Sequence, residues 1–296
     1  MTFALSTRPL CDRFGVEILG VDLAGVTENH LYPDIRQAFE AHSLLLFREQ
    51  RVSDDAHLRL AGLFGPVEDR YADERAAYKG VEISQVTNLG ANGAPVAESD
   101  LTTLNLKANM LWHTDSTFLP VPALTNIAIA RVMPDAGGAT EFASTRAAFA
   151  DLPAARRHEL RRLRLWHRYA HSRAQISAEL AALPMFNKWP DQLWPAVWKN
   201  PVNAKEAIYI ASHAFTVDGM DDDDGAAMIR ELIEWCTRPE YVYAHHWRVG
   251  DVLIWDERAT LHRGTPWPYE QPRTLSSVCS SVGDVDGLAA MLAARG

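Results

Sequence analysis

The sequence predicts a mainly β fold with inserted helices, arranged as a β-sandwich or a double-sheet jelly roll. Three observations lead to this class: many short strand-like runs, irregular connections between them, and helices that interrupt the strands without alternating regularly with them. With 47% hydrophobic and 23% charged residues among 296, the chain can form an ordinary globular core. It has no internal repeat and no linker, so we expect one domain over residues 1–296.

The first hundred residues read as strand, helix, strand, helix and a polar connection. Alternation predicts a strand over 15–23, helical spacing predicts a helix over 32–42, and the apolar run 43–49 indicates a buried strand. A second helix, 53–65, begins with a Ser/Asp cap and ends at a glycine. The polar, glycine-rich segment 88–100 is typical of a mobile connection.

The middle of the chain mixes strand and helix signals. Residues 108–118 and 123–133 have the pattern of buried strands, and 144–163 has the spacing of a helix. In the basic stretch 156–168 the charges alternate with Leu and Trp, which predicts a solvated helix face. Segment 187–203 contains too many prolines for regular structure, and we expect its tryptophans to pack in the core or to wall a pocket.

The last third of the chain returns to the strand pattern. The strand-like runs are 206–212, 241–250, 251–257 and 274–282. One helix, 226–237, lies between them, and the acidic run 218–228 supplies carboxylates to its positive N-terminal end. That run lacks the bidentate glutamate of a calcium loop, so we interpret it as a helix cap.

Charge and cysteine content limit the possible partners and compartment. A net charge of −9 argues against a nucleic-acid surface, and no apolar run approaches the roughly 20 residues that cross a bilayer. Three widely spaced cysteines and an N-terminus without a secretion signal favour a reducing environment. We expect a cytoplasmic homo-oligomer that acts on a small-molecule substrate and binds neither nucleic acid nor membrane.

The stretch LWHTDSTF (111–118) carries the first chemical signal. His113 and Asp115 are two residues apart, so on a strand both side chains point to one face and could bind one cation. His262 follows a buried strand and could join them where two sheets meet. Two imidazoles and a carboxylate on one face of an iron leave the opposite face open, as oxygen chemistry requires. Spacing alone leaves other histidines open for this role: His167, His171, His245 and His246.

Further stretches, together with LWHTDSTF, carry a resemblance to one known family. They are GVEILGVDL (15–23), LFGPVE (63–68), GGATEF (137–142), RAAFADLP (146–153), WRVGDVLIWDERATLHRG (247–264) and QPRTL (271–275). The sequence resembles the taurine dioxygenase and 2,4-dichlorophenoxyacetate dioxygenase (TauD/TfdA) family of iron(II)/2-oxoglutarate enzymes, most closely its aryloxyacetate branch. The resemblance spans nearly the whole chain and implies a double-stranded β-helix (jelly-roll, cupin-like) core.

The resemblance also assigns roles to individual residues. The family's iron ligands fall on His113, Asp115 and His262, and its 2-oxoglutarate anchors on Thr140 and Arg273. An arginine suits the far carboxylate of 2-oxoglutarate because its planar fork makes two parallel hydrogen bonds, with the threonine hydroxyl as a second donor. By the same resemblance, two more residues are expected near the substrate or iron: Asn109 and Trp255.

The implied activity is hydroxylation of a C–H bond in a small organic substrate, aryloxyalkanoate-like or otherwise aromatic or apolar. It uses Fe(II), 2-oxoglutarate as co-substrate and dioxygen, and releases succinate and carbon dioxide. Hydroxylation beside an ether oxygen or a sulfonate would cleave the ether or C–S bond. The alternative outcome is desaturation or cyclisation in biosynthesis. Two other classes are a non-catalytic small-molecule binding protein and a zinc hydrolase, although no H-E-x-x-H helix supports the latter.

One position departs from the family pattern. Many members carry a second arginine 15 residues after the last histidine, where it binds the substrate anion, and this chain has Ser277 there. Either the substrate is not such an anion or another cation reaches it from a different wall. The candidate cations are Arg70, Lys107, Arg131 and Arg173.

Overall fold

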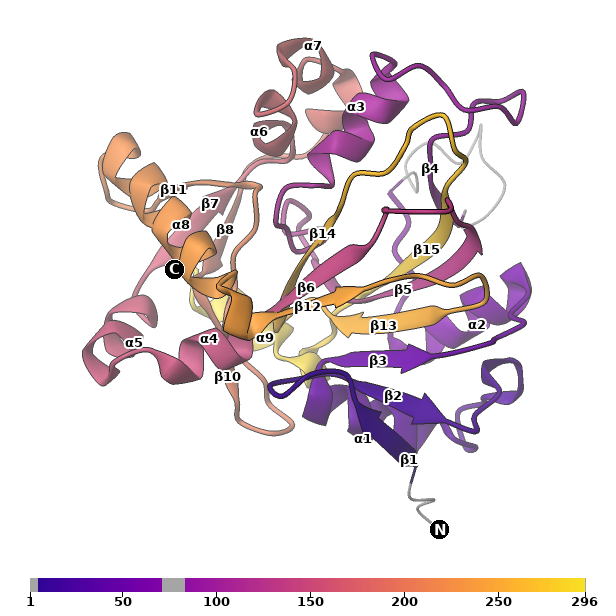
Figure 1. Ribbon diagram of the computed structural model, residues 1–296. Coiled ribbons are helices and arrows are strands. Elements are labelled where there is room, and N and C mark those ends of the chain that lie inside the picture. Colours follow the sequence, from indigo (N-terminus) through magenta and orange to yellow (C-terminus); the bar gives the residue numbers. More distant parts are fainter. Residues whose placement is uncertain (1–4, 71–82, 296) are drawn as a thin grey trace.

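A seven-stranded sheet is the largest layer of the computed structural model, which describes residues 5–70 and 83–295 (Figure 1). In spatial order its strands are β1 (Ser6–Pro9), β2 (Val16–Leu19), β3 (Leu44–Phe47), β13 (Val252–Asp256), β5 (Ala123–Val132), β15 (Thr274–Ser281) and β4 (Ser84–Thr87). Neighbouring strands are antiparallel except β2 and β3, which run parallel. The centre of the sheet therefore pairs strands from opposite ends of the chain.

A second, three-stranded sheet faces the large one. Its order is β12 (Val242–His245), β6 (Thr140–Ser144) and β14 (Thr260–Gly264). Apolar side chains of both sheets fill the space between them: Phe142 of β6 packs edge-on against Trp255 of β13, with ring centroids 5.2 Å apart. The predicted double-stranded β-helix (jelly-roll) core is thereby confirmed.

Two helices cover the outer face of the large sheet: α1 (Tyr32–His42) and α2 (Asp54–Phe64) (Figure 1). Successive side chains of β5 point to opposite faces of the large sheet. Ile127 and Ile129 belong to the core beneath the helices, and Ala128 and Ala130 face the second sheet. The predicted cap is present, since the side chain of Ser53 accepts a hydrogen bond from the Ala56 amide.

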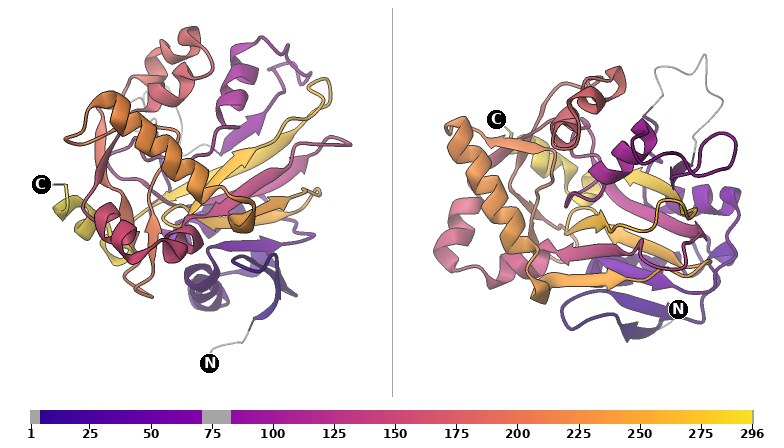
Figure 2. Two further views of the ribbon diagram at one scale, coloured as in Figure 1. Left: turned by 60° about the vertical axis from the view of Figure 1, so that its left-hand side comes forward. Right: turned by 45° about the horizontal axis from the view of Figure 1, so that its top comes forward.

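A smaller unit packs at the side of the two sheets. It contains the sheet β11 (Ala214–Val217), β7 (Arg164–His167) and β8 (Gln192–Pro195), the pair β9 (Val197–Lys199) and β10 (Glu206–Ile208), and the helices α4 (Thr145–Asp151), α5 (Ala154–Leu160) and α8 (Asp222–Cys236). Figure 2 shows α8 lying along this side, where it packs on β11. The side chain of Asp221 accepts from the Asp223 amide, so the predicted acidic cap is confirmed.

Three short helices gather above the sheets, at the top of Figure 1: α3 (Leu101–Ala108), α6 (Tyr169–Ala174) and α7 (Ala178–Ala181). The last helix is α9 (Leu288–Ala293), and 3-10 turns occur at Leu23–Gly25, Pro184–Phe186, Pro239–Tyr241 and Asp284–Asp286. Over the described ranges, every helix is too short or too polar to cross a bilayer.

The predicted strand over 108–118 was wrong. Helix α3 ends at Ala108, and the residues after it form turns in which His113 makes an isolated bridge to His262. Ser116 has a φ of 59°, and its carbonyl accepts from the Leu119 amide, so the chain reverses where an extended strand was expected. The apolar residues of this stretch are buried by neighbouring elements and not by strand pairing.

Two helix predictions were also too long. Residues 144–163 form two helices, because Pro153 has no amide hydrogen to continue the first. The basic stretch 156–168 leaves the helix at Leu160, and its last part is strand β7, paired with β8 and β11. Pairing with these distant strands overrides the local helical pattern.

The proline-rich segment 187–203 is more regular than predicted. It contains β8 and β9, and Pro195 is tolerated because it lies at the end of its strand. Trp194 and Trp198 are completely buried, and their indole N–H groups donate to the carbonyls of Thr117 and Asp286. These two tryptophans therefore pack in the core.

Candidate active site

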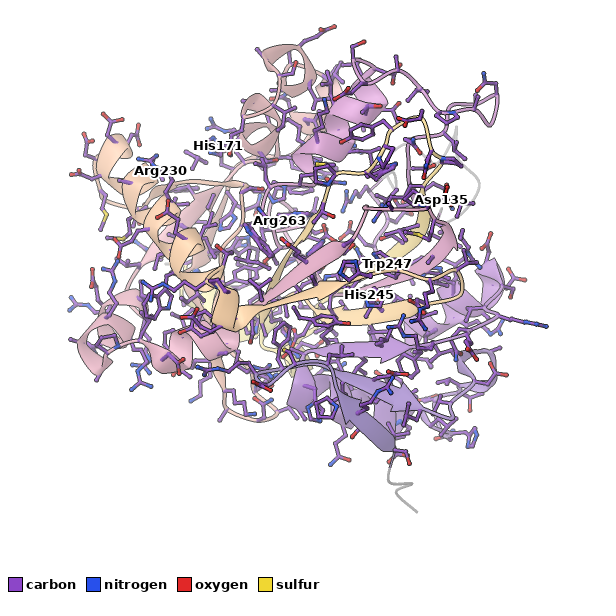
Figure 3. The ribbon with its side chains drawn as sticks, in the orientation of Figure 1. Asp135, His171, Arg230, His245, Trp247 and Arg263 are labelled. Atoms are coloured by element: carbon purple, nitrogen blue, oxygen red, sulfur yellow. The ribbon has the colours of Figure 1, made fainter. Side chains whose placement is uncertain are left out.

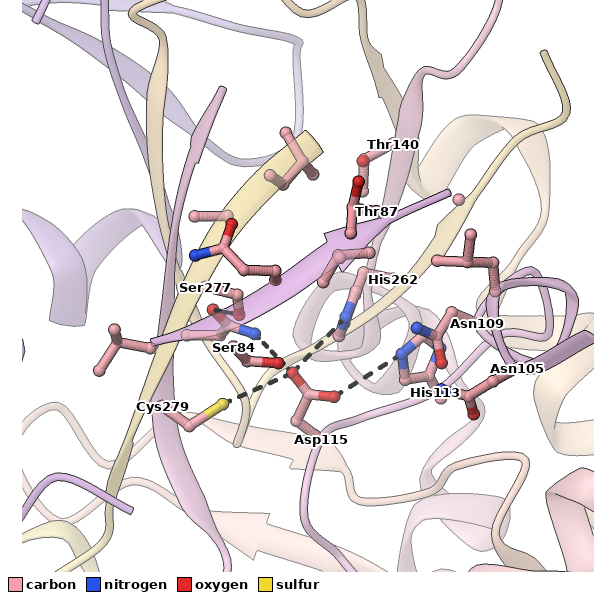
Figure 4. A pocket seen from close by; sticks show the side chains of 18 of the residues that line it. Ser84, Thr87, Asn105, Asn109, His113, Asp115, Thr140, His262, Ser277 and Cys279 are labelled. Atoms are coloured by element: carbon pink, nitrogen blue, oxygen red, sulfur yellow. Dashed lines mark hydrogen bonds and ion pairs between the residues drawn. The ribbon is translucent and has the colours of Figure 1, made fainter. Parts of the chain in front are cut away.

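A cavity of about 560 Å³ opens between the large sheet, the second sheet and the helices α3 and α6 (Figure 4). The residues that the family resemblance placed at the site, with Ser277, all line it: Asn109, His113, Asp115, Thr140, Trp255, His262, Arg273 and Ser277. Aromatic side chains form part of its wall, with Phe118 and Tyr169 stacked in parallel at a centroid distance of 3.6 Å.

The backbone itself brings the two histidines together. The amide of His113 donates to the carbonyl of His262 at 3.0 Å, and the amide of His262 donates back at 2.8 Å. The two ring centroids are consequently 4.1 Å apart, although 149 positions separate the residues in the chain. These two hydrogen bonds fix the backbone of His113 relative to that of His262, independently of any ion or ligand bound by the side chains.

Asp115 completes a cluster with metal-ligand spacing. Its carboxylate oxygens lie 3.7 Å from His113 Nε2 and 3.8 Å from His262 Nε2, and all the potential ligand atoms lie within 4.8 Å of one another (Figure 4). His113 Nδ1 lies 2.7 Å from the Leu111 carbonyl, which can only accept, so this nitrogen carries the hydrogen and Nε2 presents its lone pair. The donor set fits an octahedral iron with an open face.

The charge states of the cluster also suit a metal. Burial lowers the pKa of His113, and burial together with the facing His113 lowers the pKa of His262 to about 3, so both imidazoles are neutral at physiological pH. Burial opposes ionisation of Asp115, but the facing histidines and Arg70 lower its pKa below the usual range. Neutral imidazoles and an ionised carboxylate are the forms that coordinate a cation.

The other candidate histidines lie outside this cluster. His167 Nδ1 bonds to the Thr117 hydroxyl and His245 Nε2 to Asp251, while His171 packs beside Phe215. His246, the remaining candidate, is likewise absent from the metal-ligand cluster found among the described residues. Among the candidate histidines, only His262 lies beside His113 and Asp115 in the described part of the chain.

Residues that the sequence reasoning missed brace Asp115. Asn126 Nδ2 donates to Asp115 Oδ2 at 2.7 Å, and the hydroxyl of Ser277 donates to Asn126 Oδ1 at 2.8 Å. The Asp115 amide donates to the buried carboxyl of Glu257, which also lies 4.0 Å from His262 Nδ1. Two features of the sequence could have indicated these residues. Asn126 is a polar residue in the largely apolar strand TNIAIA, and Glu257 is a second acidic residue in LIWDE.

Thr140 and Arg273 lie together at another part of the cavity. Arg273 is buried on the cavity wall with its guanidinium over the ring of Trp267, Nε donates to the Gly138 carbonyl, and no described carboxylate pairs with it. Burial lowers its pKa to about 10, which still leaves it charged at neutral pH. This buried cation has room for a carboxylate.

Trp247, another residue that the sequence reasoning missed, controls the Thr140 hydroxyl. Its indole N–H donates to Thr140 Oγ1 at 2.9 Å. Because an indole nitrogen can only donate, the oxygen of Thr140 accepts, and its own hydrogen is free to point at a ligand. Trp247 lies beside His245, and both are labelled in Figure 3.

Comparison with known proteins agrees with this geometry. The family model described as "Taurine catabolism dioxygenase TauD, TfdA family" matches residues 6–279. The chain belongs to the TauD/TfdA family. It is therefore an oxidoreductase, a dioxygenase that uses Fe(II), 2-oxoglutarate (α-ketoglutarate) and dioxygen.

Individual members of the TauD/TfdA family are similar over nearly their whole length. The α-ketoglutarate-dependent 2,4-dichlorophenoxyacetate dioxygenase of Cupriavidus pinatubonensis is 31% identical, covering 90% of this chain and 94% of its own. The (S)-phenoxypropionate/α-ketoglutarate-dioxygenase of Sphingobium herbicidovorans is 29% identical, covering 93% and 94%. The structure of AAD-2 with Mn(II) and N-oxalylglycine has a TM-score of 0.86 at 30% identity, covering 94% and 97%.

Proposed function

We propose that His113, Asp115 and His262 hold the Fe(II) ion and that Thr140 and Arg273 bind the far carboxylate of 2-oxoglutarate. The observation that carries the proposal is the convergence of two Nε2 atoms and one carboxylate within 4.8 Å, in the cavity that the buried Arg273 also lines. Bound there, iron and 2-oxoglutarate would supply the activation of dioxygen and the release of succinate and carbon dioxide.

The chain's own groups have separate tasks in this reaction. The Leu111 carbonyl holds His113 in the tautomer that ligates, and Asn126 orients the Asp115 carboxylate. The guanidinium of Arg273 and the hydroxyl of Thr140 would fix the co-substrate at its unreactive end. Aromatic side chains in the cavity wall, such as Phe118, Tyr169 and Trp255, would limit the access of bulk water to the reacting atoms.

The reaction that we infer is hydroxylation of a C–H bond in a small organic acid or related molecule with an aromatic or apolar body. Relatives named for 2,4-dichlorophenoxyacetate and phenoxypropionate support an aryloxyalkanoate-like substrate. Aromatic side chains in the cavity wall, among them Phe118, Tyr169 and Trp255, supply apolar surface for such a ring. Hydroxylation of the carbon next to the ether oxygen would then split the ether.

Three unpaired cysteines, Cys11, Cys236 and Cys279, support a reducing, cytoplasmic setting.

Two variants test the two halves of the site, with Mn(II) binding and succinate formation as measurements. His262→Ala removes a ligand and should abolish both, because two remaining ligands hold a divalent ion weakly. Arg273→Lys should raise the 2-oxoglutarate KM at least tenfold while Mn(II) still binds, since an ammonium cannot reproduce the fork. Arg131→Lys is the matched control, because Arg131 pairs with Asp54 and does not line the cavity. Full succinate formation by His262→Ala would refute the assignment.

A further inference from the structure

The sequence offers four cationic side chains that could bind a substrate anion, and the structure distinguishes among them. Lys107 and Arg131 do not line the cavity, and each is ion-paired to a carboxylate, of Glu98 and Asp54 respectively. The other two, Arg70 and Arg173, do line it. The choice therefore lies between these two guanidinium groups.

Arg70 already has a counter-ion. Its Nε lies 2.5 Å from a carboxylate oxygen of Glu68, and Nη2 donates to the Ser116 hydroxyl at 3.1 Å. Its guanidinium also lies over the ring of Phe118, 5.5 Å from the centroid. An incoming anion would have to compete with Glu68 for this cation.

Arg173 is buried without a counter-ion. Its residue is only 5% exposed, and no carboxylate in the described ranges is ion-paired with it. Nη1 donates to the neighbouring Ser172 hydroxyl at 2.8 Å, whereas Nη2 has only two long contacts of 3.4 Å, to Asn109 Oδ1 and the Tyr169 hydroxyl. Nε is buried with no hydrogen-bond partner. A desolvated charge of this kind is unfavourable unless an anion reaches it.

The surroundings hold this guanidinium in place beside the metal cluster. One face stacks on Tyr169, with the carbon of the guanidinium 4.5 Å from the ring centroid, and Phe186 lies 5.2 Å away. The carbonyl of Asn109 accepts from the Gly264 amide, two residues beyond His262, which ties this wall to strand β14. The guanidinium is therefore held in place, and Nη2, beside the cavity-lining Asn109, is its weakly occupied group.

We propose that Arg173 is the anchor for a carboxylate on the primary substrate, reached from helix α6 and not from strand β15. This inference rests on the proposed function, since it names the substrate of that site. Ser277 cannot take the role, because its hydroxyl already donates to Asn126. The favoured substrate is an aromatic carboxylic acid whose ring lies near Phe118 and Tyr169 and whose carboxylate pairs with Nη2 of Arg173.

Binding of a matched acid and amide tests the proposal without turnover. Phenoxyacetate and phenoxyacetamide are titrated into the metal-free protein and into protein loaded with Mn(II) and N-oxalylglycine. We expect the wild type to bind the acid at least tenfold more tightly than the amide in both forms. Arg173→Met should weaken the acid ten- to a hundredfold and reduce the preference to less than about threefold. Arg173→Lys should recover part of the preference.

Arg168→Met is the matched control. Arg168 immediately precedes α6, is ion-paired to Asp191 and does not line the cavity, so this variant should keep the preference for the acid. Melting temperatures separate folding from binding: Arg173→Met replaces an unpaired buried charge and should melt no lower than the wild type. A wild type that does not prefer the acid, or an unchanged preference in Arg173→Met, overturns the anchor. Failure to bind Mn(II) and N-oxalylglycine would instead refute the proposed function. In that case the titration of the metal-free protein would still test whether Arg173 binds the carboxylate.

Discussion

Asn126 is the residue on which the orientation of Asp115 depends. Its amide donates to the carboxylate oxygen that also faces His262, and the hydroxyl of Ser277 holds the amide in turn. We predict that Asn126→Ala weakens Mn(II) binding by about ten- to a hundredfold, the usual effect of removing such a partner from a metal ligand. Ser280→Ala removes a buried hydroxyl from β15, the strand of Ser277, that donates to the Ala61 carbonyl, and it should bind Mn(II) normally in the same titration. Equal affinity in the two variants would show that Asp115 is held by other contacts.

Trp247 offers a second test at the scale of one atom. Trp247→Phe deletes the N–H that orients the Thr140 hydroxyl, and we predict a rise of about three- to tenfold in the 2-oxoglutarate KM, the worth of one hydrogen bond near 1 kcal/mol. Trp235→Phe deletes an indole N–H that donates to the Ala148 carbonyl, and it should leave this KM unchanged. A rise in both variants would point to general loosening of the fold and not to the Thr140 hydroxyl.

Among the elements, α8 illustrates a helix whose start is set by local chemistry. The Asp221 side chain caps it, and three further aspartates lie in its first turn. Asp221→Ala should lower the free energy of unfolding by about 1 kcal/mol in urea denaturation. Glu234→Ala, an exposed change near the opposite end of the same helix, should be neutral or slightly stabilising because a carboxylate there opposes the helix dipole. An equal loss in both variants would count against the cap.

Elements with local signals were predictable from the sequence, and elements that depend on distant partners were not. The caps at Ser53 and Asp221 depend on residues a few positions away, and both predictions are confirmed. Strand β7 was mistaken for helix because its pairing with β8 and β11 is invisible in the local pattern. The same limit applies to the site: Asn126 meets Ser277 and Trp247 meets Thr140 across 151 and 107 positions of the chain, and the local pattern does not reveal such partners.

At the scale of the whole molecule, His57 links stability to pH. It is a fully buried residue of α2, its Nε2 contacts the Ile127 carbonyl, and burial lowers its pKa from 6.5 to about 4. Below pH 6.5 the unfolded chain takes up a proton that the folded protein refuses until about pH 4. The free energy of unfolding should therefore fall across this window, by up to about 3 kcal/mol from this group alone, and remain unaffected above it.

The check is a comparison of urea unfolding between pH 7 and pH 4. His57→Gln keeps an N–H donor for the Ile127 carbonyl but cannot titrate, so its stability should fall less steeply with acid than that of the wild type. His158→Gln, an exposed substitution, should follow the wild-type curve. Parallel curves for all three proteins would exclude His57 as a source of the acid sensitivity.

The reciprocal backbone bonds between His113 and His262 have a consequence for the protein while it is being made. A ribosome releases His113 and Asp115 first, and His262 emerges 149 residues after His113. At roughly 5 to 20 residues per second this delay is about 7 to 30 s, longer than the closing of any local loop. During that interval the nascent chain holds only two of the three proposed ligands, in a turn to which the strand of His262 is not yet paired. The complete set of proposed ligands can thus assemble only after His262 has been translated.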